Sequence, residues 1–152
     1  MELGVNATEY AKSVKPDREA WRQSVPQTCM WCGTVDRSDL WGPCGGLQIH
    51  EMERRSHASK RWWHRCTALL LCGVCHSMDF AAMPHAAQLA VKLARDPDHF
   101  DLAEWLAIGS RPATYVTAED VKAEYKRIYG VTPNEAALRR LDGTAVRKVD
   151  GA

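Results

Sequence analysis

The chain has 152 residues, of which 45% are hydrophobic and 26% are charged, a composition typical of one globular domain with its own core. No apolar run approaches the roughly 20 residues that span a bilayer, and the N-terminus has no apolar stretch of the signal-peptide type. These features exclude membrane-spanning, secreted and collagen-like proteins and favour a cytoplasmic location. The net charge of +1 by itself indicates no nucleic-acid partner.

The first half of the chain is predicted to contain short elements. Residues 1–26 form a polar lead-in with a short helix at about 17–23, which begins near Pro16. Alternating apolar and polar residues predict a strand at 47–51. A compact apolar piece at 67–71 predicts a second extended segment.

The second half is predicted to be helical. Apolar residues recur at helical spacing in 84–95 and 101–108. The pattern at 117–120 is that of a capping box and starts a third helix. A similar pattern at 132–135 starts a fourth helix, with Pro133 at its first position and its end at about residue 141.

Six cysteines give the strongest signal in the sequence, because four of them form two C-x2-C pairs. Each pair brings two thiolates within reach of one ion, and two pairs complete the tetrahedral site of structural zinc. We therefore expect structural Zn²⁺ on the four paired residues, which are Cys29, Cys32, Cys72 and Cys75. The alternatives are redox-active pairs, a disulfide framework or plain buried cysteines. Cys44 and Cys66 are expected to be free thiols.

Positive charge is concentrated between residues 54 and 65, which contain five basic residues, two histidines and no carboxylate. Basic side chains contact phosphates and tryptophans stack on bases, so this segment is a candidate nucleic-acid interface. The candidate contact residues are Arg54, Arg55, Lys60, Arg61, Arg65, Trp62 and Trp63. In the alternative interpretation, the tryptophans belong to the core and the charges form a solvated face.

Three motifs together resemble the HNH endonucleases, in particular the type whose ββα-metal hairpin is braced by a four-cysteine zinc site. The motifs are CMWCG, LQIHE and ALLLCGVCH, and the resemblance covers roughly residues 29–80. It implies an α+β fold with a zinc-bound HNH-like module at 27–82, followed by a helical extension at 83–143. A tail at 144–152 is expected to be disordered. The resemblance also suggests a phage or prokaryotic origin.

The resemblance implies roles for four residues. In the family, a metal-ligating histidine is followed directly by a general-base histidine, an asparagine helps to hold the histidine loop, and a last histidine ligates the metal. These positions here carry His50, Glu51, Thr67 and His76. A catalytic divalent ion, Mg²⁺ or another, is therefore expected on His50 and His76.

Two of these positions depart from the family pattern, so the general base stays open. A free glutamate has a pKa of about 4.3 and is a weak base at neutral pH. Glu51 is either a substituted base or a third metal ligand, and His57 or His64 is the alternative base. Thr67 keeps a hydroxyl but lacks the amide of asparagine.

The sequence leaves three functions open. The first is a metal-dependent HNH-like endonuclease that hydrolyses phosphodiester bonds in DNA. The second is a catalytically inactive descendant whose zinc module binds DNA or a protein partner. The third is a structural or interaction protein that binds a partner, or a second copy of itself, through its C-terminal helices at 84–141. No membrane partner is expected.

Overall fold

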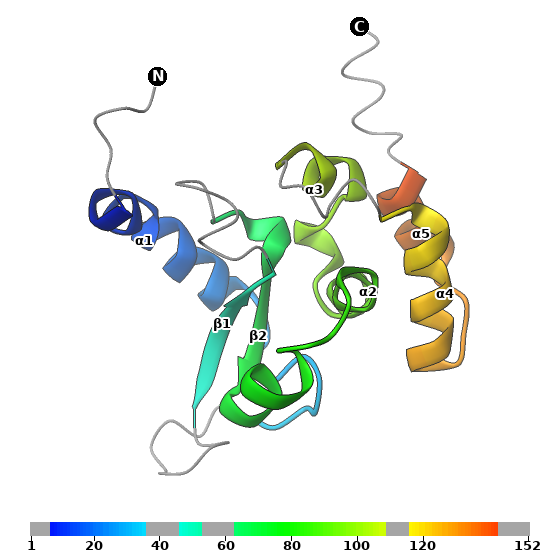
Figure 1. Cartoon of the computed structure of the whole chain (residues 1–152), viewed down its shortest axis with the longest axis horizontal. Coiled ribbons are helices and arrows are strands. Elements are labelled where there is room, and N and C mark those ends of the chain that lie inside the picture. Colours follow the sequence, from blue (N-terminus) through cyan, green and yellow to red (C-terminus); the bar gives the residue numbers. More distant parts are fainter. Residues whose placement is uncertain (1–6, 36–45, 53–62, 109–115, 143–152) are drawn as a thin grey trace, which may run out of the picture.

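The computed structural model describes residues 7–35, 46–52, 63–108 and 116–142 (Figure 1). These ranges contain a two-stranded sheet and several helices, so the fold is α+β, as the sequence predicts. No helix in this described part of the chain has the length and apolar character needed to cross a membrane. The predicted disordered tail at 144–152 lies outside the described residues.

The elements follow one another in a simple order. They are α1 (Ala7–Ser24), β1 (Leu47–Glu51), η1 (Arg65–Thr67), β2 (Ala68–Cys72), η2 (Cys75–Asp79), α2 (His85–Arg95), η3 (Pro97–His99), α3 (Leu102–Ile108), α4 (Ala118–Tyr129) and α5 (Glu135–Asp142). Here η1 and η3 are 3-10 helices and η2 is a single π-helical turn. The strands predicted at 47–51 and 67–71 are therefore confirmed to within one residue.

The first helix is longer than the sequence predicts, and Pro16 lies inside it. We expected the helix to begin near Pro16 because proline lacks the N–H that a helix interior uses. That prediction is wrong because the buried face continues on both sides of the proline. Val14 and Trp21, two turns apart on one face, are 8% and 4% exposed. Burial of this face offsets the lost backbone hydrogen bond.

The hairpin lies between α1 and α2 (Figure 1). β1 and β2 are antiparallel, with a register that runs from Leu47 opposite Cys72 to Glu51 opposite Ala68. Every residue of β2 is buried, whereas β1 is buried only at its start. Because successive side chains of a strand point to opposite faces, β1 can present one residue toward α1 and the next toward α2.

A buried lysine fastens α2 to the start of β2. Lys92 is fully buried, and its Nζ donates to the backbone oxygens of Arg65 and Ala68, each at 2.7 Å. It also pairs with the carboxylate of Asp96 at 2.7 Å. The same carboxylate accepts a 2.8 Å hydrogen bond from Nε1 of Trp21 on α1. One buried polar cluster therefore joins α1, η1, β2 and α2.

The last helices cover the far side of α2, where α4 packs against it. The predicted capping box of α4 is confirmed, since Thr117 and Asp120 exchange side-chain to backbone hydrogen bonds. The start of α5 differs from the prediction. Pro133 lies before the helix, and Asn134 accepts the N–H of Ala137 through its Oδ1 at 2.9 Å. Asparagine is a favoured N-cap, so α5 begins at Glu135, two residues after Pro133.

Candidate metal centre

The first cysteine pair lies in a tight turn. The backbone N–H of Cys29 donates to the oxygen of Thr34 at 2.7 Å, and the N–H of Gly33 donates to the oxygen of Cys29 at 3.0 Å. Gly33 has a φ of 81°, a left-handed conformation that glycine adopts without steric cost. The turn also directs the N–H of Cys32 to Sγ of Cys29 at 3.5 Å, so both sulfurs lie on one side of it.

The second pair meets the first because the turn is hydrogen-bonded to β2. The N–H of Met30 donates to the oxygen of Leu70 at 2.8 Å, two residues before Cys72 ends the strand. Cys75 is the first residue of η2, three positions after the end of β2. The resulting distance between Sγ of Cys32 and Sγ of Cys72 is 3.8 Å.

The four paired cysteines form one cluster whose sulfur atoms all lie within 4.8 Å of one another. A tetrahedral zinc site with bonds of about 2.3 Å requires sulfurs about 3.8 Å apart, so the cluster is geometrically compatible with a structural metal such as zinc. Three of its members are buried, and Cys32 is exposed. All five cysteines among the described residues are free thiols, which does not support the alternative of a disulfide framework.

The electrostatics of the cluster also suit a cation. Burial opposes ionisation of Cys32, but hydrogen bonds with Thr34 and Cys29 outweigh it and lower the pKa of this thiol to about 7. Burial and the neighbouring thiols Cys72 and Cys29 raise the pKa of Cys75. Several thiolates in one small volume repel one another, and a bound divalent cation removes this penalty.

Beside the cysteine cluster, two histidines face each other. His50 lies on β1, and His76 follows Cys75 in η2, so the hairpin and the turn after it bring both imidazoles together. Their Nδ1 atoms are 3.0 Å apart, and the rings meet edge to face with centroids 5.1 Å apart. The ring of Phe80 packs against His50 with a centroid distance of 5.6 Å.

This separation fits two ligands of one ion. Bonds of about 2.0–2.1 Å at angles between 90° and the tetrahedral value place two ligand nitrogens about 2.9–3.4 Å apart. Burial lowers the pKa of His50, and the nearby His76 and His85 lower it further, although the hydrogen bond with Gln88 opposes the shift. His50 is therefore neutral near pH 7, the form in which imidazole binds a metal.

Gln88, which was not predicted as a site residue, contacts His50 from α2. Gln88 is 5% exposed, and its Oε1 lies 2.8 Å from Nε2 of His50. Its Nε2 donates to the backbone oxygen of Met83 at 2.8 Å. In the sequence, Gln88 stands among the apolar residues of this helix. That position could have identified Gln88, since a polar side chain on a buried helix face is usually held by a hydrogen bond.

The structure does not bring Glu51 to the two imidazoles. Its carboxylate accepts hydrogen bonds from Arg18 on α1, at 2.8 Å from Nη2 and 3.1 Å from Nε. Glu51 follows His50 in the strand, so the two side chains point to opposite faces of the sheet. The roles predicted for Glu51, substituted base or third ligand, find no support in this geometry.

Thr67 is hydrogen-bonded to described residues on both sides of the segment at 53–62. Its hydroxyl donates to the backbone oxygen of His64 at 2.8 Å, and its own backbone oxygen accepts the N–H of Met52 at 2.8 Å. The residue is fully buried. Thr67 therefore joins Met52 to His64, through its hydroxyl and its backbone carbonyl rather than through a side-chain amide.

The predicted nucleic-acid contacts lie mostly outside the described residues. This applies to Arg54, Arg55, Lys60, Arg61 and Trp62, and also to His57. Trp63 is half-buried and packs edge to face on Trp21, with centroids 6.1 Å apart, as in the alternative that assigned it to the core. Arg65 is exposed and lies 3.8 Å from the carboxylate of Glu104. Trp63 and Arg65, together with residues of α1, line an open hollow of about 580 Å³.

A second group of metal-type side chains, His64, Cys66 and Glu104, is already committed to other contacts. Nδ1 of His64 accepts the N–H of Cys66 at 3.2 Å and caps η1. Burial, reinforced by Glu104, raises the pKa of the Cys66 thiol. The thiol is therefore protonated and the imidazole lone pair is in use, which leaves no ready ligand set.

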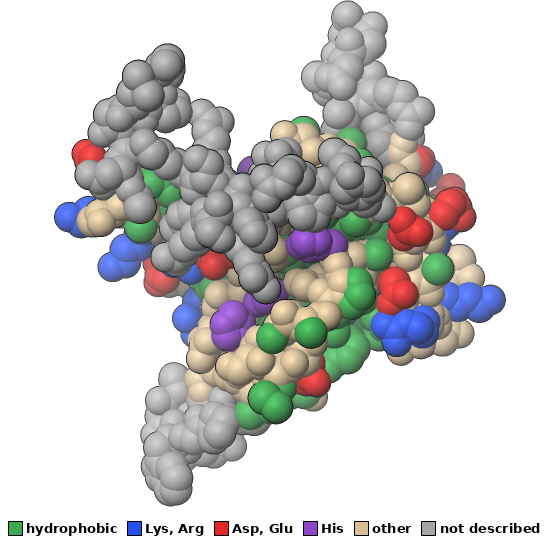
Figure 2. All heavy atoms as spheres, viewed as in Figure 1, with side chains coloured by type: hydrophobic (Ala, Val, Ile, Leu, Met, Phe, Trp, Pro, Cys, Tyr) green, Lys and Arg blue, Asp and Glu red, His purple; other side chains and the backbone are tan. Residues whose placement is uncertain are grey.

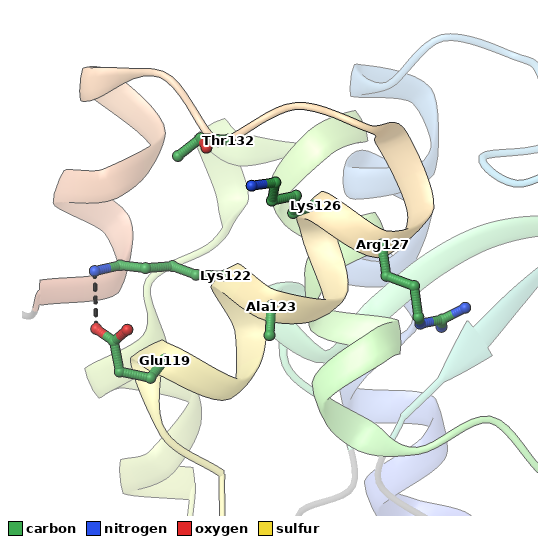
Figure 3. A pocket seen from close by; sticks show the side chains of 6 residues that line it. All are labelled: Glu119, Lys122, Ala123, Lys126, Arg127 and Thr132. Carbon is green, nitrogen blue, oxygen red and sulfur yellow. Dashed lines mark hydrogen bonds and ion pairs between the residues drawn. The ribbon is translucent and has the colours of Figure 1, made fainter.

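The outer face of α4 carries a shallow hollow of about 510 Å³ (Figure 3). Lys122 points to Glu119 in this view and pairs with it at 3.0 Å. Arg127 pairs with Glu124 at 2.6 Å. Acidic and basic side chains alternate over this part of the surface (Figure 2). Two of the three cationic side chains that line the hollow are therefore paired with carboxylates.

Histidine side chains reach the surface near the hairpin and α2 on the face shown in Figure 2.

No protein-family model matches this chain, and no curated protein and no solved structure matches it. Among the described residues, the four-cysteine cluster and the pair of imidazoles beside it bring side chains of metal-ligand type together.

Proposed function

We propose that this protein is a metal-dependent HNH-like endonuclease that hydrolyses phosphodiester bonds in DNA. The observation that carries the proposal is the approach of His50 and His76 to 3.0 Å, on a hairpin and the turn that follows it, beside a four-cysteine cluster. Two antiparallel strands followed by the π-helical turn η2 support the proposal, because the resemblance implies two strands and a helical segment around the ion. Structural zinc on the cysteines and a second, exchangeable ion on the histidines are both part of the proposal.

In this proposal each residue has a limited task. His50 and His76 hold the divalent ion, Mg²⁺ or another, which when bound stabilises negative charge on the phosphate and on the leaving oxygen. The cysteine cluster fixes η2, because Cys75 directly precedes His76. Thr67 is hydrogen-bonded to Met52, directly after β1, and to His64, directly before η1. Arg65, exposed at the end of that connection, is available to contact a DNA phosphate.

The test is a plasmid-nicking assay with Mg²⁺, Mn²⁺ or Ni²⁺ on the zinc-loaded protein. We expect cleavage with at least one of these ions and a loss of at least about 100-fold in His50→Ala, because a ligand of the catalytic ion is removed. Gln48→Ala is the matched control, since Gln48 is exposed on the same strand. Equal zinc content in both variants would show that the cysteine cluster is intact. Cleavage that survives in His50→Ala would reject the proposal.

A second candidate function is favoured by the ion pair of Glu51 with Arg18. This pair turns the residue at the family's base position away from the histidines, as expected for a catalytically inactive module that binds DNA. In that case no ion would support nicking, while fluorescence anisotropy would still detect binding of a DNA duplex that weakens steeply with salt. The absence of both cleavage and binding would reject both functions.

A further inference from the structure

The environment of Gln88 determines which nitrogen of His50 carries the proton. The backbone oxygen of Met83 can only accept a hydrogen bond, so the Gln88 atom 2.8 Å from it is the amide nitrogen. The amide oxygen then faces Nε2 of His50 at 2.8 Å. Because that oxygen can only accept, Nε2 of His50 must be the donor.

This chain of hydrogen bonds fixes the tautomer of the neutral imidazole. A proton on Nε2 leaves the lone pair on Nδ1, and Nδ1 is the atom that lies 3.0 Å from Nδ1 of His76. The hydrogen bond also holds the ring plane, and Phe80 packs against the same ring. Gln88 is 5% exposed, so water competes little for its amide oxygen.

We propose that Gln88 is a positioning residue that holds His50 in the Nε2-protonated tautomer, so that a divalent ion binds to Nδ1 of His50. The inference rests on the proposed function for the presence of that ion, but the tautomer itself is a property of the protein without it. The same arrangement, in which a metal-binding histidine donates its other ring N–H to an oxygen, raises metal affinity by orienting the ligand. Here the oxygen comes from α2, which couples this helix to the hairpin.

The first test reads the tautomer directly. Long-range ¹H–¹⁵N correlation spectra are recorded on the full chain with zinc on the cysteine cluster and no second ion added. We expect the wild type to show His50 protonated at Nε2 alone. Gln88→Met, of similar shape but without the acceptor, should show a mixture of both tautomers. Gln48→Met is the matched control on the exposed face of β1.

The second test measures affinity for Mn²⁺, a hard ion that competes poorly for thiolates, by titration calorimetry. We expect Gln88→Met to bind about 10- to 100-fold more weakly than Gln48→Met. An unchanged His50 tautomer in Gln88→Met would overturn the role of Gln88. A wild-type protein that shows the expected tautomer but binds no second ion would instead reject the proposed function, so the two failures are distinguishable.

Discussion

His50 and Glu51 are neighbours in the chain but belong to different parts of the molecule. His50 faces His76 and Gln88, whereas Glu51 faces α1 and pairs with Arg18. Strand geometry alone produces this separation, because consecutive side chains leave opposite faces. Glu51 thus joins α1 to the sheet through its ion pair with Arg18.

The Glu51 ion pair leads to the first prediction. We expect Glu51→Gln to leave Mn²⁺ affinity within about twofold and to lower the free energy of unfolding by about 1 kcal/mol, because a partly buried ion pair is lost while the proposed ion site on His50 and His76 is unchanged. Urea unfolding and calorimetric titration measure the two effects. A double-mutant cycle with Arg18→Gln should show that the pair accounts for the change. A large loss of metal affinity would instead restore Glu51 as a ligand.

The second prediction concerns pH and His64. Burial lowers the pKa of His64, with smaller contributions of both signs from Glu104, Arg65 and Lys92. Between the folded-state pKa and the unfolded value of about 6.5, the unfolded chain binds more protons, so stability is complete above about pH 6.5 and decreases as the pH falls through this window. Protonation of Nδ1 also removes the acceptor for the Cys66 N–H.

His64→Asn should reduce this pH dependence, because asparagine does not titrate and can still accept the hydrogen bond at the start of η1. The measurement is the free energy of unfolding in urea between pH 5 and pH 7. If the slope is the same in the variant and the wild type, another group is responsible.

At the scale of elements, local side-chain to backbone bonds decide where the C-terminal helices begin. Thr117 and Asp120 form a reciprocal capping box for α4, and Gly130, with a φ of 76°, ends this helix. The start of α5 depends on Asn134, although Thr132 and Pro133 precede it with a similar pattern. Two patterns that look alike in the sequence are thus used differently.

The third prediction separates these caps. We expect Thr117→Ala and Asn134→Ala each to lower the free energy of unfolding by about 1 kcal/mol, because each removes an acceptor from a helix N-terminus. Thr132→Ala should have almost no effect, since Thr132 is exposed and is not the cap. Chemical denaturation of the three variants provides the comparison. A Thr132→Ala effect as large as that of Asn134→Ala would contradict the assignment.

At the scale of the whole molecule, the cluster of Lys92 and Asp96 joins segments that are far apart in the chain. Trp21, on α1, donates to the same Asp96 carboxylate and lies under Lys92, whose Nζ is 4.8 Å from its ring. The backbone oxygens that Lys92 binds belong to Arg65 and Ala68, at the start of β2. Loss of this lysine would therefore disturb the packing of both halves of the molecule.

The fourth prediction follows from this burial. Lys92→Met should lower the free energy of unfolding by about 3–5 kcal/mol, because the Asp96 carboxylate would remain buried without its cationic partner. Lys122→Met is the matched control, since Lys122 pairs with Glu119 at the surface, and we expect a change within about 0.5 kcal/mol. Thermal and urea unfolding would measure both. Similar effects in the two variants would show that Lys92 does not hold the core.

Several features could be predicted from the sequence because they depend on residues close together in the chain. The two C-x2-C pairs predicted a metal-type cluster, and the structure brings all four sulfurs together. Alternating residues predicted β1, and the pattern at Thr117 predicted the start of α4. Spacing and local hydrogen bonds set the strand, the capping box and each C-x2-C turn, whereas the meeting of the two cysteine pairs also depends on the tertiary hydrogen bond between Met30 and Leu70. The role of His50 and His76 in binding an ion stays a prediction.

Other features were decided only by tertiary contacts. The part of α1 that precedes Pro16 depends on what the buried face of the helix packs against, and the ion pair of Glu51 depends on α1 bringing Arg18 to it. The hydrogen bond of Gln88 with His50 joins residues 38 positions apart. Burial of an ionic or polar group is favourable only when a partner from elsewhere in the chain satisfies it, and the fold alone supplies that partner.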